Sequence, residues 1–304
     1  MPASTLSDRA LIVVTGSERL SFLNGLLTNN LGPVESGATV YACLLTPQGK
    51  YLFDFFIRAE GDRLLLEVDA ARRADCLRRL SLYKLRADVT LAAEDGYKVL
   101  AGFDAPLPEG GIAFADPRHP NLGWRCWWPV SEPLPPMIDA PVAPGATPWL
   151  DLALTAANAV AVLAGGDAPQ SAAAPAVSAS AFDAYHRHRI GLGVPDGSRD
   201  LEPDRSILLE FNLDCFNAID FAKGCYIGQE LTARTKYRAV LKRKAQPVRL
   251  TGPVPPPGTP ILAGEKEAGE LRFAVPGLGL ALIRLDADPA AELTADGTAV
   301  TLMA

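Results

Sequence analysis

The sequence lacks the cysteine and histidine patterns that hold a structural metal ion or a disulfide framework. Its 304 residues include five cysteines and three histidines, with no Cys-x-x-Cys pair and no His-Glu-x-x-His pattern. An even set of cysteines is typical of disulfide-rich secreted domains, and closely spaced Cys or His pairs are typical of zinc sites. The sequence therefore predicts free thiols in a reducing compartment and no dedicated histidine-based metal site.

Long apolar runs are also missing. The longest charge-free stretch of apolar character, residues 152–166, has 15 residues, fewer than the roughly 20 that a membrane-spanning helix needs. The first residues contain neither a basic segment followed by a long apolar run nor an Arg-rich amphipathic segment, so we expect no targeting signal. These absences predict a soluble, cytoplasmic protein with no membrane partner.

The charge balance argues against nucleic acid as the main partner. Lys and Arg number 29 against 35 Asp and Glu, a net charge of -6, and an acidic protein repels a phosphate backbone. One segment differs, because residues 231–264 contain no acidic residue and several basic ones. Its basic residues are Arg234, Lys236, Arg238, Lys242, Arg243, Lys244 and Arg249. This segment is either a solvated face or a receptor for an anionic ligand or an acidic partner surface.

The first hundred residues alternate strand and helix patterns. Runs rich in β-branched and aromatic residues predict strands at 9–15, 39–46, 51–59, 64–68, 89–93 and 97–103. The Pro-Gln-Gly-Lys turn at 47–50 joins two of them into a hairpin. A helix follows Gly16, and a second follows Asp69, which we expect to cap it while Arg72 and Arg73 stay in water. Without a βαβ repeat, this order predicts an α+β fold with antiparallel sheets.

The rest of the chain changes character twice. Prolines and alanines are concentrated at about 129–181, which predicts mainly linker. The glycines after the basic helix at 182–190 have neither the spacing nor the preceding strand of a dinucleotide-binding loop, so we reject that reading. After Lys244, strand patterns and an Asp296-Gly297 turn predict a small barrel or sandwich.

Cys225 lies in a stretch suited to chemistry, "FAKGCYIGQE" at 221–230. Gly224 and Gly228 allow a ligand to approach the backbone closely. A cation such as Lys223 favours the thiolate, which is the form that ligates metals and attacks electrophiles. The alternative is a buried, inert cysteine.

These residues also resemble a known family. "KGCYIGQE" (223–230), continuing to Arg234, is similar to the signature of the YgfZ family, folate-binding iron-sulfur cluster assembly and repair proteins related to the aminomethyltransferase (T-protein) of the glycine cleavage system. The stretch 185–244 looks like the mitochondrial iron-sulfur branch of that family. The blocks at 22–30, 46–55, 83–86 and 207–214 resemble its other blocks.

The resemblance implies the GcvT/YgfZ-like architecture, a three-part ring around a channel that binds tetrahydrofolate. Two α+β units, antiparallel sheet plus helices, would occupy residues 1–240 as the folate-binding region, with the Pro- and Ala-rich section at about 129–181 between them. A C-terminal β-barrel would occupy residues 241–304.

The resemblance also implies roles for single residues. Asp54 lies where aminomethyltransferases keep the second, catalytic carboxylate of an Asp-Asp pair, and Phe53 stands at the first position; the alternative for Asp54 is an ordinary strand carboxylate. Glu210 lies where the relatives place a carboxylate that accepts two N–H groups of the pterin ring, and the alternative is a packing glutamate. Other residues of the signature are candidates for cofactor binding, with Tyr226 offering a stacking face: Lys223, Gly224, Tyr226, Gln229, Glu230 and Arg234.

Three functions follow. In the first, the protein is a tetrahydrofolate-binding accessory factor of iron-sulfur cluster biogenesis or repair, with Cys225 as a cluster ligand or a reactive thiol. Such clusters usually take four protein ligands, so a carrier protein, a client or an exogenous thiol must supply the others. In the second, a folate-dependent aminomethyltransferase uses Asp54 for catalysis. The third, nucleic-acid binding through the basic segment, is the least favoured.

Overall fold

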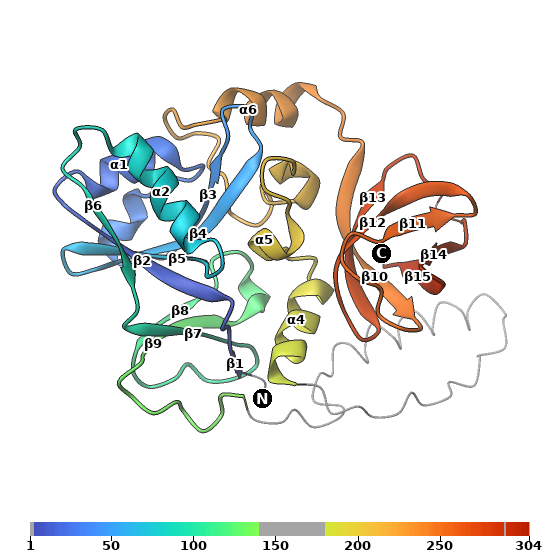
Figure 1. The fold of residues 1–304 in the computed structure, drawn as a ribbon, viewed down its shortest axis with the longest axis horizontal. Helices are drawn as coiled ribbons and strands as arrows, with labels where there is room; N and C mark the ends of the chain where they lie inside the picture. The colour runs from blue at the N-terminus through green and yellow to red at the C-terminus, as the bar shows by residue number, and fades with distance from the viewer. Residues whose placement is uncertain (1–2, 140–179, 289, 304) are drawn as a thin grey trace.

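The structure, a computed structural model, describes residues 3–139, 180–288 and 290–303. Two open sheets with their helices and a separate barrel make up these residues, and the helices α4 (Ala181–Gly191) and α5 (Gly197–Asp200) lie between them (Figure 1). The predicted linker at 129–181 lies mostly outside the described residues. Only its two ends are described, where one strand ends at Pro129 and α4 begins at Ala181.

The first unit is a five-stranded antiparallel sheet in the order β3-β4-β5-β2-β6. It comprises β2 (Arg9–Thr15), α1 (Arg19–Leu26), the 3₁₀ helix η1 (Gly32–Ser36), β3 (Val40–Leu45), β4 (Tyr51–Glu60), β5 (Arg63–Asp69), α2 (Arg73–Lys84) and β6 (Thr90–Glu94). The predicted hairpin at 47–50 is confirmed, since β3 and β4 pair directly across that turn. One face of β4 packs Phe53 and Phe55 against the helices, and the other directs Asp54 and Phe56 toward the centre of the molecule.

The start of α2 differs from the prediction. The helix begins at Arg73 with Arg72 at the N-cap, and Asp69 acts one turn earlier, where its Oδ1 accepts a hydrogen bond from the Arg72 backbone N–H at 3.1 Å. Arg72 is also not left in water, because its guanidinium group stacks on the Phe53 ring at 4.1 Å. A cation packed on an aromatic face keeps its charge while it covers apolar surface.

The second sheet has four strands in the order β1-β7-β9-β8. They are β1 (Ala3–Thr5), β7 (Tyr97–Gly102), β8 (Ile112–Ala115) and β9 (Trp124–Pro129), and the 3₁₀ helix η2 (Pro120–Leu122) precedes β9. The helix α4 contacts β1 of this sheet and two strands of the barrel, while α5 contacts β4 and one barrel strand. These two helices therefore link all three parts.

The C-terminal part is a closed barrel of six strands. They are β10 (Arg243–Thr251), β11 (Pro260–Ala263), β12 (Lys266–Val275), β13 (Leu278–Arg284), β14 (Leu293–Ala295) and β15 (Thr298–Leu302), in the order β10-β13-β12-β11-β14-β15. Pairing of β15 with β10 closes it. Asp296 and Gly297 have φ values of 47° and 77° at the β14–β15 turn, the positive values that a two-residue hairpin requires. A barrel rather than a sandwich is therefore present, and the predicted α+β class is confirmed.

Two more elements lead from α5 to the barrel, the 3₁₀ helix η3 (Leu208–Phe211) and the helix α6 (Gln229–Arg238). No helix in the described part of the chain is long and apolar enough to span a bilayer.

Candidate functional site

The signature containing Cys225 forms an exposed loop that ends at the N-terminus of α6. Cys225 is exposed, whereas its neighbour Tyr226 is only 7% exposed and packs in the largest core cluster. Burial raises the pKa of Tyr226 to about 12. The loop thus has an inner side that anchors it and an outer side that presents the thiol. Because the Tyr226 ring lies in the core, it offers no open face for stacking on a pterin.

Lys223 anchors this loop to the end of α1. Its Nζ donates hydrogen bonds to the backbone oxygens of Asn24, Leu27 and Asn29 at 2.8, 2.7 and 2.7 Å. The last carbonyls of a helix lack partners within the helix and carry partial negative charge, so an ammonium group binds well there. Burial lowers the pKa of Lys223 to about 8. The expected role of Lys223 in favouring the Cys225 thiolate thus gives way to a mechanical one, because its ammonium group is directed at these carbonyls.

The two glycines of the loop differ. Gly228 has a φ of 80° and precedes α6, and a Cβ built there would lie 2.6 Å from Thr46 O and 3.0 Å from Gly49 Cα. Only glycine permits this close contact with the β3–β4 turn. Gly224, next to the thiol, has no positive φ and nothing within 4 Å of a built Cβ. Its small size serves no contact within the described protein, and the space beside Cys225 is open.

The remaining signature residues lie on the first turns of α6. Gln229 is half-buried, and Glu230 and Arg234 are exposed. Glu230 is in the first turn, where a carboxylate is stabilised by the N-terminal end of the helix.

Cys225 is one of two exposed thiols among the five cysteines. Burial raises the pKa of the Cys43 and Cys76 thiols, and that of Cys126 to about 12, which makes these three unreactive. The second exposed thiol, Cys215, was missed by sequence reasoning. It follows Asp214, which forms an ion pair with Lys236 of α6 at 2.7 Å. The only sequence signal of exposure directly beside Cys215 is Asp214, because Phe216 on its other side is buried.

Asp54 lies far from solvent and is fully engaged by protein groups. Its Oδ1 accepts a hydrogen bond from the Tyr51 hydroxyl at 2.9 Å, and its Oδ2 accepts one from the Tyr41 hydroxyl at 3.2 Å. Arg9 pairs with the same carboxylate, Nη2 to Oδ2, at 3.4 Å. Burial and the Asp54 charge raise the pKa of both tyrosines well above their usual range, so both stay protonated as donors.

Asp54 is one end of a buried charge network that sequence reasoning did not find. Glu67 pairs with Arg9 at 2.9 Å and with Arg125 at 3.2 Å, and accepts a hydrogen bond from the Trp127 indole at 2.9 Å. The network continues through Arg118, which pairs with Asp116 at 2.8 Å and donates to Pro195 O at 3.0 Å.

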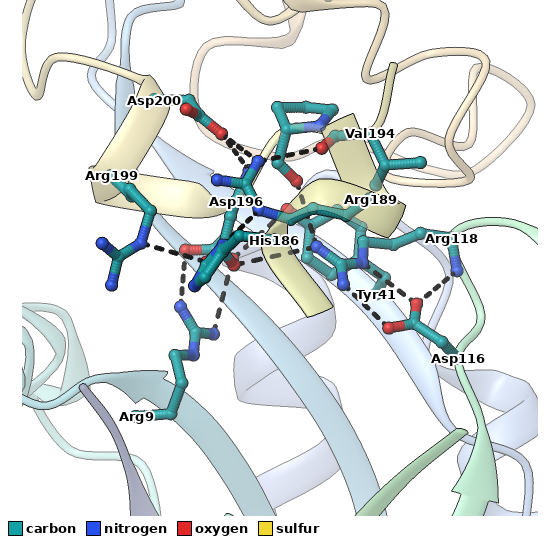
Figure 2. A network of polar contacts seen from close by, with 12 residues as sticks. Arg9, Tyr41, Asp116, Arg118, His186, Arg189, Val194, Asp196, Arg199 and Asp200 are labelled. Carbon is teal, nitrogen blue, oxygen red and sulfur yellow. Dashed lines mark hydrogen bonds and ion pairs between the residues drawn. The ribbon is translucent and has the colours of Figure 1, made fainter. Parts of the chain in front are cut away.

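The other half of the network comes from the α4–α5 segment. Arg189 pairs with Asp200 at 2.7 Å and donates to Val194 O at 3.1 Å, and Asp196 lies 3.8 Å from Arg118. Figure 2 shows these side chains gathered between the two sheets and α5. Five buried carboxylates meet four buried guanidinium groups and the partly buried Arg199. Pairing on this scale offsets part of the desolvation and positions the three parts, although among the described residues no hydrogen-bond partner meets the guanidinium nitrogens of Arg125.

Tetrahydrofolate, the cofactor that the resemblance implies, does not fit Asp54 in this structure. Gly197 of α5 has a φ of 37°, and a Cβ built on it would lie 2.7 Å from Cγ and 2.9 Å from Oδ2 of Asp54. On the side that faces α5, Asp54 therefore lacks room even for a methyl group, and Tyr41, Tyr51 and Arg9 occupy its other contacts. Glu210 is likewise buried, on η3, with its Oε2 3.4 Å from Nη2 of Arg243. Asp54 therefore presents no free edge to a ligand, whereas Glu210, among the described residues, has this one contact through Oε2.

His186 makes the stability of this region depend on pH. Its Nδ1 accepts a hydrogen bond from Arg189 Nε at 2.7 Å, so the ring is neutral, and burial together with the Arg189 charge holds its pKa well below the usual value. The unfolded chain takes up this proton below pH about 6.5, whereas the folded chain does not. We expect the free energy of unfolding to fall by about 1.4 kcal/mol for each pH unit below that point, for this proton alone.

Urea unfolding between pH about 7 and about 5 measures this effect. His186→Asn is the matched control, because its amide oxygen replaces the Nδ1 acceptor without titrating. A variant with the same pH slope as the wild type would show that His186 is not responsible.

Known proteins resemble both the barrel and the chain as a whole. Residues 242–304 match the family model described as CAF17, C-terminal beta-barrel domain. The iron-sulfur cluster assembly factor IBA57, mitochondrial, of Homo sapiens is 32% identical over 308 residues, covering 91% of this chain and 76% of its own length. The Mus musculus protein of that name is 32% identical over 311 residues, covering 92% and 76%.

One solved structure shows the fold. The aminomethyltransferase T of the glycine cleavage system from Bartonella henselae superposes with a TM-score of 0.63 at 14% identity, covering 100% of this chain and 86% of the other. The sheets and barrel therefore have the arrangement that the resemblance implied.

The names of the relatives correct one expectation. The absence of a recognisable leader predicted a cytoplasmic protein, but the relatives from Homo sapiens, Mus musculus and Pyricularia oryzae are named mitochondrial. The cytoplasmic prediction is contradicted.

The exposed Cys225 loop, the GcvT-like fold and the similarity along nine-tenths of the sequence lead to one conclusion. The chain belongs to the IBA57 family of iron-sulfur cluster assembly factors.

Proposed function

We propose that this protein acts in iron-sulfur cluster assembly by holding a cluster, as cargo, through the Cys225 thiolate together with ligands from outside the chain. The observation that carries the proposal is the exposed thiol on a firmly anchored loop. Lys223 attaches one side of that loop to α1 and Gly228 fits the other side against the β3–β4 turn. A ligand held in place in this way loses little freedom when it binds, which favours binding. The names of the relatives support the same process.

Two observations indicate that the other ligands of the cluster come from outside this chain. An iron-sulfur cluster usually takes about four protein ligands. In the part of the chain that the structure describes, no three His, Cys, Asp or Glu side chains are grouped to hold a metal ion. The open space beside Gly224 gives a partner protein or a small thiol access to the cluster.

Replacing Cys225 by serine tests the proposal. Ferric iron, sulfide and glutathione would be added to the reduced protein under nitrogen. Visible absorption of the bound cluster and its transfer to an apo-ferredoxin would be followed. We expect Cys225→Ser to lose bound cluster by at least about tenfold, since the hydroxyl is a far poorer ligand for iron than a thiolate. Cys215→Ser is the matched control, and it should retain the cluster.

Equal cluster binding by the wild type and Cys225→Ser would rule the proposal out. The remaining role for the residue would then be that of a redox-reactive thiol. If the wild-type protein bound no cluster but its Cys225 thiol were alkylated as fast as a free thiol, the role of a redox-reactive thiol would be favoured.

Aminomethyl transfer is not part of this proposal. An acid or base must reach the proton that it moves, and Asp54 is enclosed by Arg9, Tyr41, Tyr51 and Gly197. Tetrahydrofolate binding elsewhere on the chain stays a prediction of the sequence.

A further inference from the structure

The outward side of α6 borders the Cys225 loop and is hollowed. Figure 1 shows α6 at the edge of the molecule, where the chain leaves the first unit and turns toward the barrel. A depression of about 800 Å³ lies along this side of the helix, and its lining residues define what we term the α6 face. They are Gln229, Glu230, Ala233, Arg234, Tyr237, Arg238 and Ala239. The first of them, Gln229, is four residues beyond Cys225 in the chain, at the end of the Cys225 loop.

The charges of the α6 face are unpaired and mainly positive. Arg234 and Arg238 are four residues apart, so both side chains project on one side of the helix. Among the described residues, neither has an acidic partner, whereas Lys236 on another side of α6 is paired with Asp214 at 2.7 Å. Of the described residues that line the depression, Glu230 is the one carboxylate. Two free guanidinium groups thus remain available to an external carboxylate.

Exposed apolar side chains accompany these charges. Tyr237 is 70% exposed and Val240, just past the helix, is 91% exposed. The Tyr237 ring packs edge-on against Phe221 with ring centres 6.0 Å apart, which restricts its motion. Tyrosine and arginine are the residues most often found at the energetic centres of protein interfaces. An exposed, positioned tyrosine between two free arginines has the composition of such a centre.

We propose that the α6 face is the docking surface for an acidic partner protein, the one that brings the remaining ligands to the cluster on Cys225. This inference rests on the proposed function. Charge complementarity selects an acidic partner, because residues 231–264 contain no acidic residue. The exposed Tyr237 and Val240 select a protein rather than nucleic acid, which is bound by many phosphate contacts, and the net charge of -6 disfavours the latter.

The test measures binding of an acidic peptide to the full chain without a cluster. The probe is a fluorescein-labelled peptide of about 12 residues, rich in Glu with one Leu and one Phe, followed by anisotropy at about 50 mM and about 300 mM salt. We expect Arg234→Glu combined with Arg238→Glu to weaken binding by at least about tenfold, and higher salt to weaken binding to the wild type. Tyr237→Ala should weaken it by about tenfold through the lost anchor.

The matched control reverses two other exposed cations, Lys98 on β7 and Lys266 on β12, by Lys98→Glu combined with Lys266→Glu. This variant has the same net charge as the first one and should bind within about twofold of the wild type. Equal weakening by both double variants would overturn the proposal, because the effect would then follow net charge alone. Undetectable binding to the wild type would overturn it as well.

Two further arms separate the alternatives. Cys225→Ser should lose the cluster and bind the peptide as the wild type does, a result that supports both proposals. Cluster retained by Cys225→Ser would refute the proposed function, while docking of an acidic protein on the α6 face would still be supported by peptide binding. Tighter binding of a single-stranded RNA of about 12 nucleotides than of the peptide would overturn the choice of a protein partner. A concentration-dependent dimer that Arg234→Glu with Arg238→Glu abolishes would instead assign the α6 face to a second copy of this chain.

Discussion

Replacing Asp54 by asparagine should lower the free energy of unfolding by about 3 to 5 kcal/mol, the range seen when one partner of a buried ion pair is removed. The buried guanidinium group of Arg9 would keep its charge and lose one of its two carboxylates. The asparagine amide would also turn a donor toward Arg9 or toward the Tyr41 and Tyr51 hydroxyls, all of which are donors in this structure. The loss therefore combines an uncompensated charge with a poorly matched hydrogen bond.

Urea unfolding at pH 7 measures this loss. Asp95→Asn is the control, because Asp95 also pairs with an arginine, Arg73 at 2.6 Å, but is 77% exposed. It should change stability by less than about 1 kcal/mol. If Asp54→Asn were as stable as the wild type while a tetrahydrofolate-dependent aminomethyl transfer disappeared, Asp54 would be a catalytic group and the structural role would be wrong.

Replacing Gly228 by alanine should cost about 2 to 4 kcal/mol and detach the Cys225 loop from its support. About 1 to 2 kcal/mol comes from a side chain at a φ of 80°, and the rest comes from the methyl group that would lie 2.6 Å from Thr46 O. The β3–β4 turn or the start of α6 must shift to relieve this contact. We therefore expect faster alkylation of Cys225 and weaker cluster binding as well as lower stability.

Gly224→Ala is the control for this prediction. It lies in the same loop and meets nothing within 4 Å, so its stability should stay within about 0.5 kcal/mol of the wild type. Equal destabilisation by the two alanine variants would mean that the loop tolerates no side chain anywhere, and the specific contact between Gly228 and the β3–β4 turn would not be the cause.

Local sequence patterns predicted most of the strands and turns of the fold. Alternating residues and turn formers predicted the β3–β4 hairpin and the β14–β15 turn, since both depend on neighbours in the chain. For Cys225 the sequence left two possibilities open, a loop thiol suited to chemistry and a buried, inert one. The alternative of a buried, inert cysteine is excluded by its exposure.

Contacts between residues far apart in the chain could not be predicted from the sequence. Lys223 binds carbonyls that lie about 200 residues earlier in the chain, and backbone oxygens leave no mark on the sequence. Arg118 and Arg125 look like surface residues by composition, because charged side chains are seldom fully buried. Arg118 pairs with Asp116 two residues earlier, but Arg125 pairs with Glu67 of β5 and Arg118 also with Asp196 at the start of α5. A single sequence does not say which of these distant charges meet.

The buried charge network divides into two sets that are each neutral. Arg9, Arg118 and Arg125 balance Asp54, Glu67 and Asp116 within residues 3–139, and Arg189 and Arg199 balance Asp196 and Asp200 within the α4–α5 segment. Arg199 also pairs with the partly exposed Asp8 at the edge of the network. A ribosome releases the first set well before the second. Each set can neutralise its own charges as it emerges, so the later segment closes over the earlier one without carrying an unpaired charge into the interior. The order of synthesis and the order of assembly are thereby compatible.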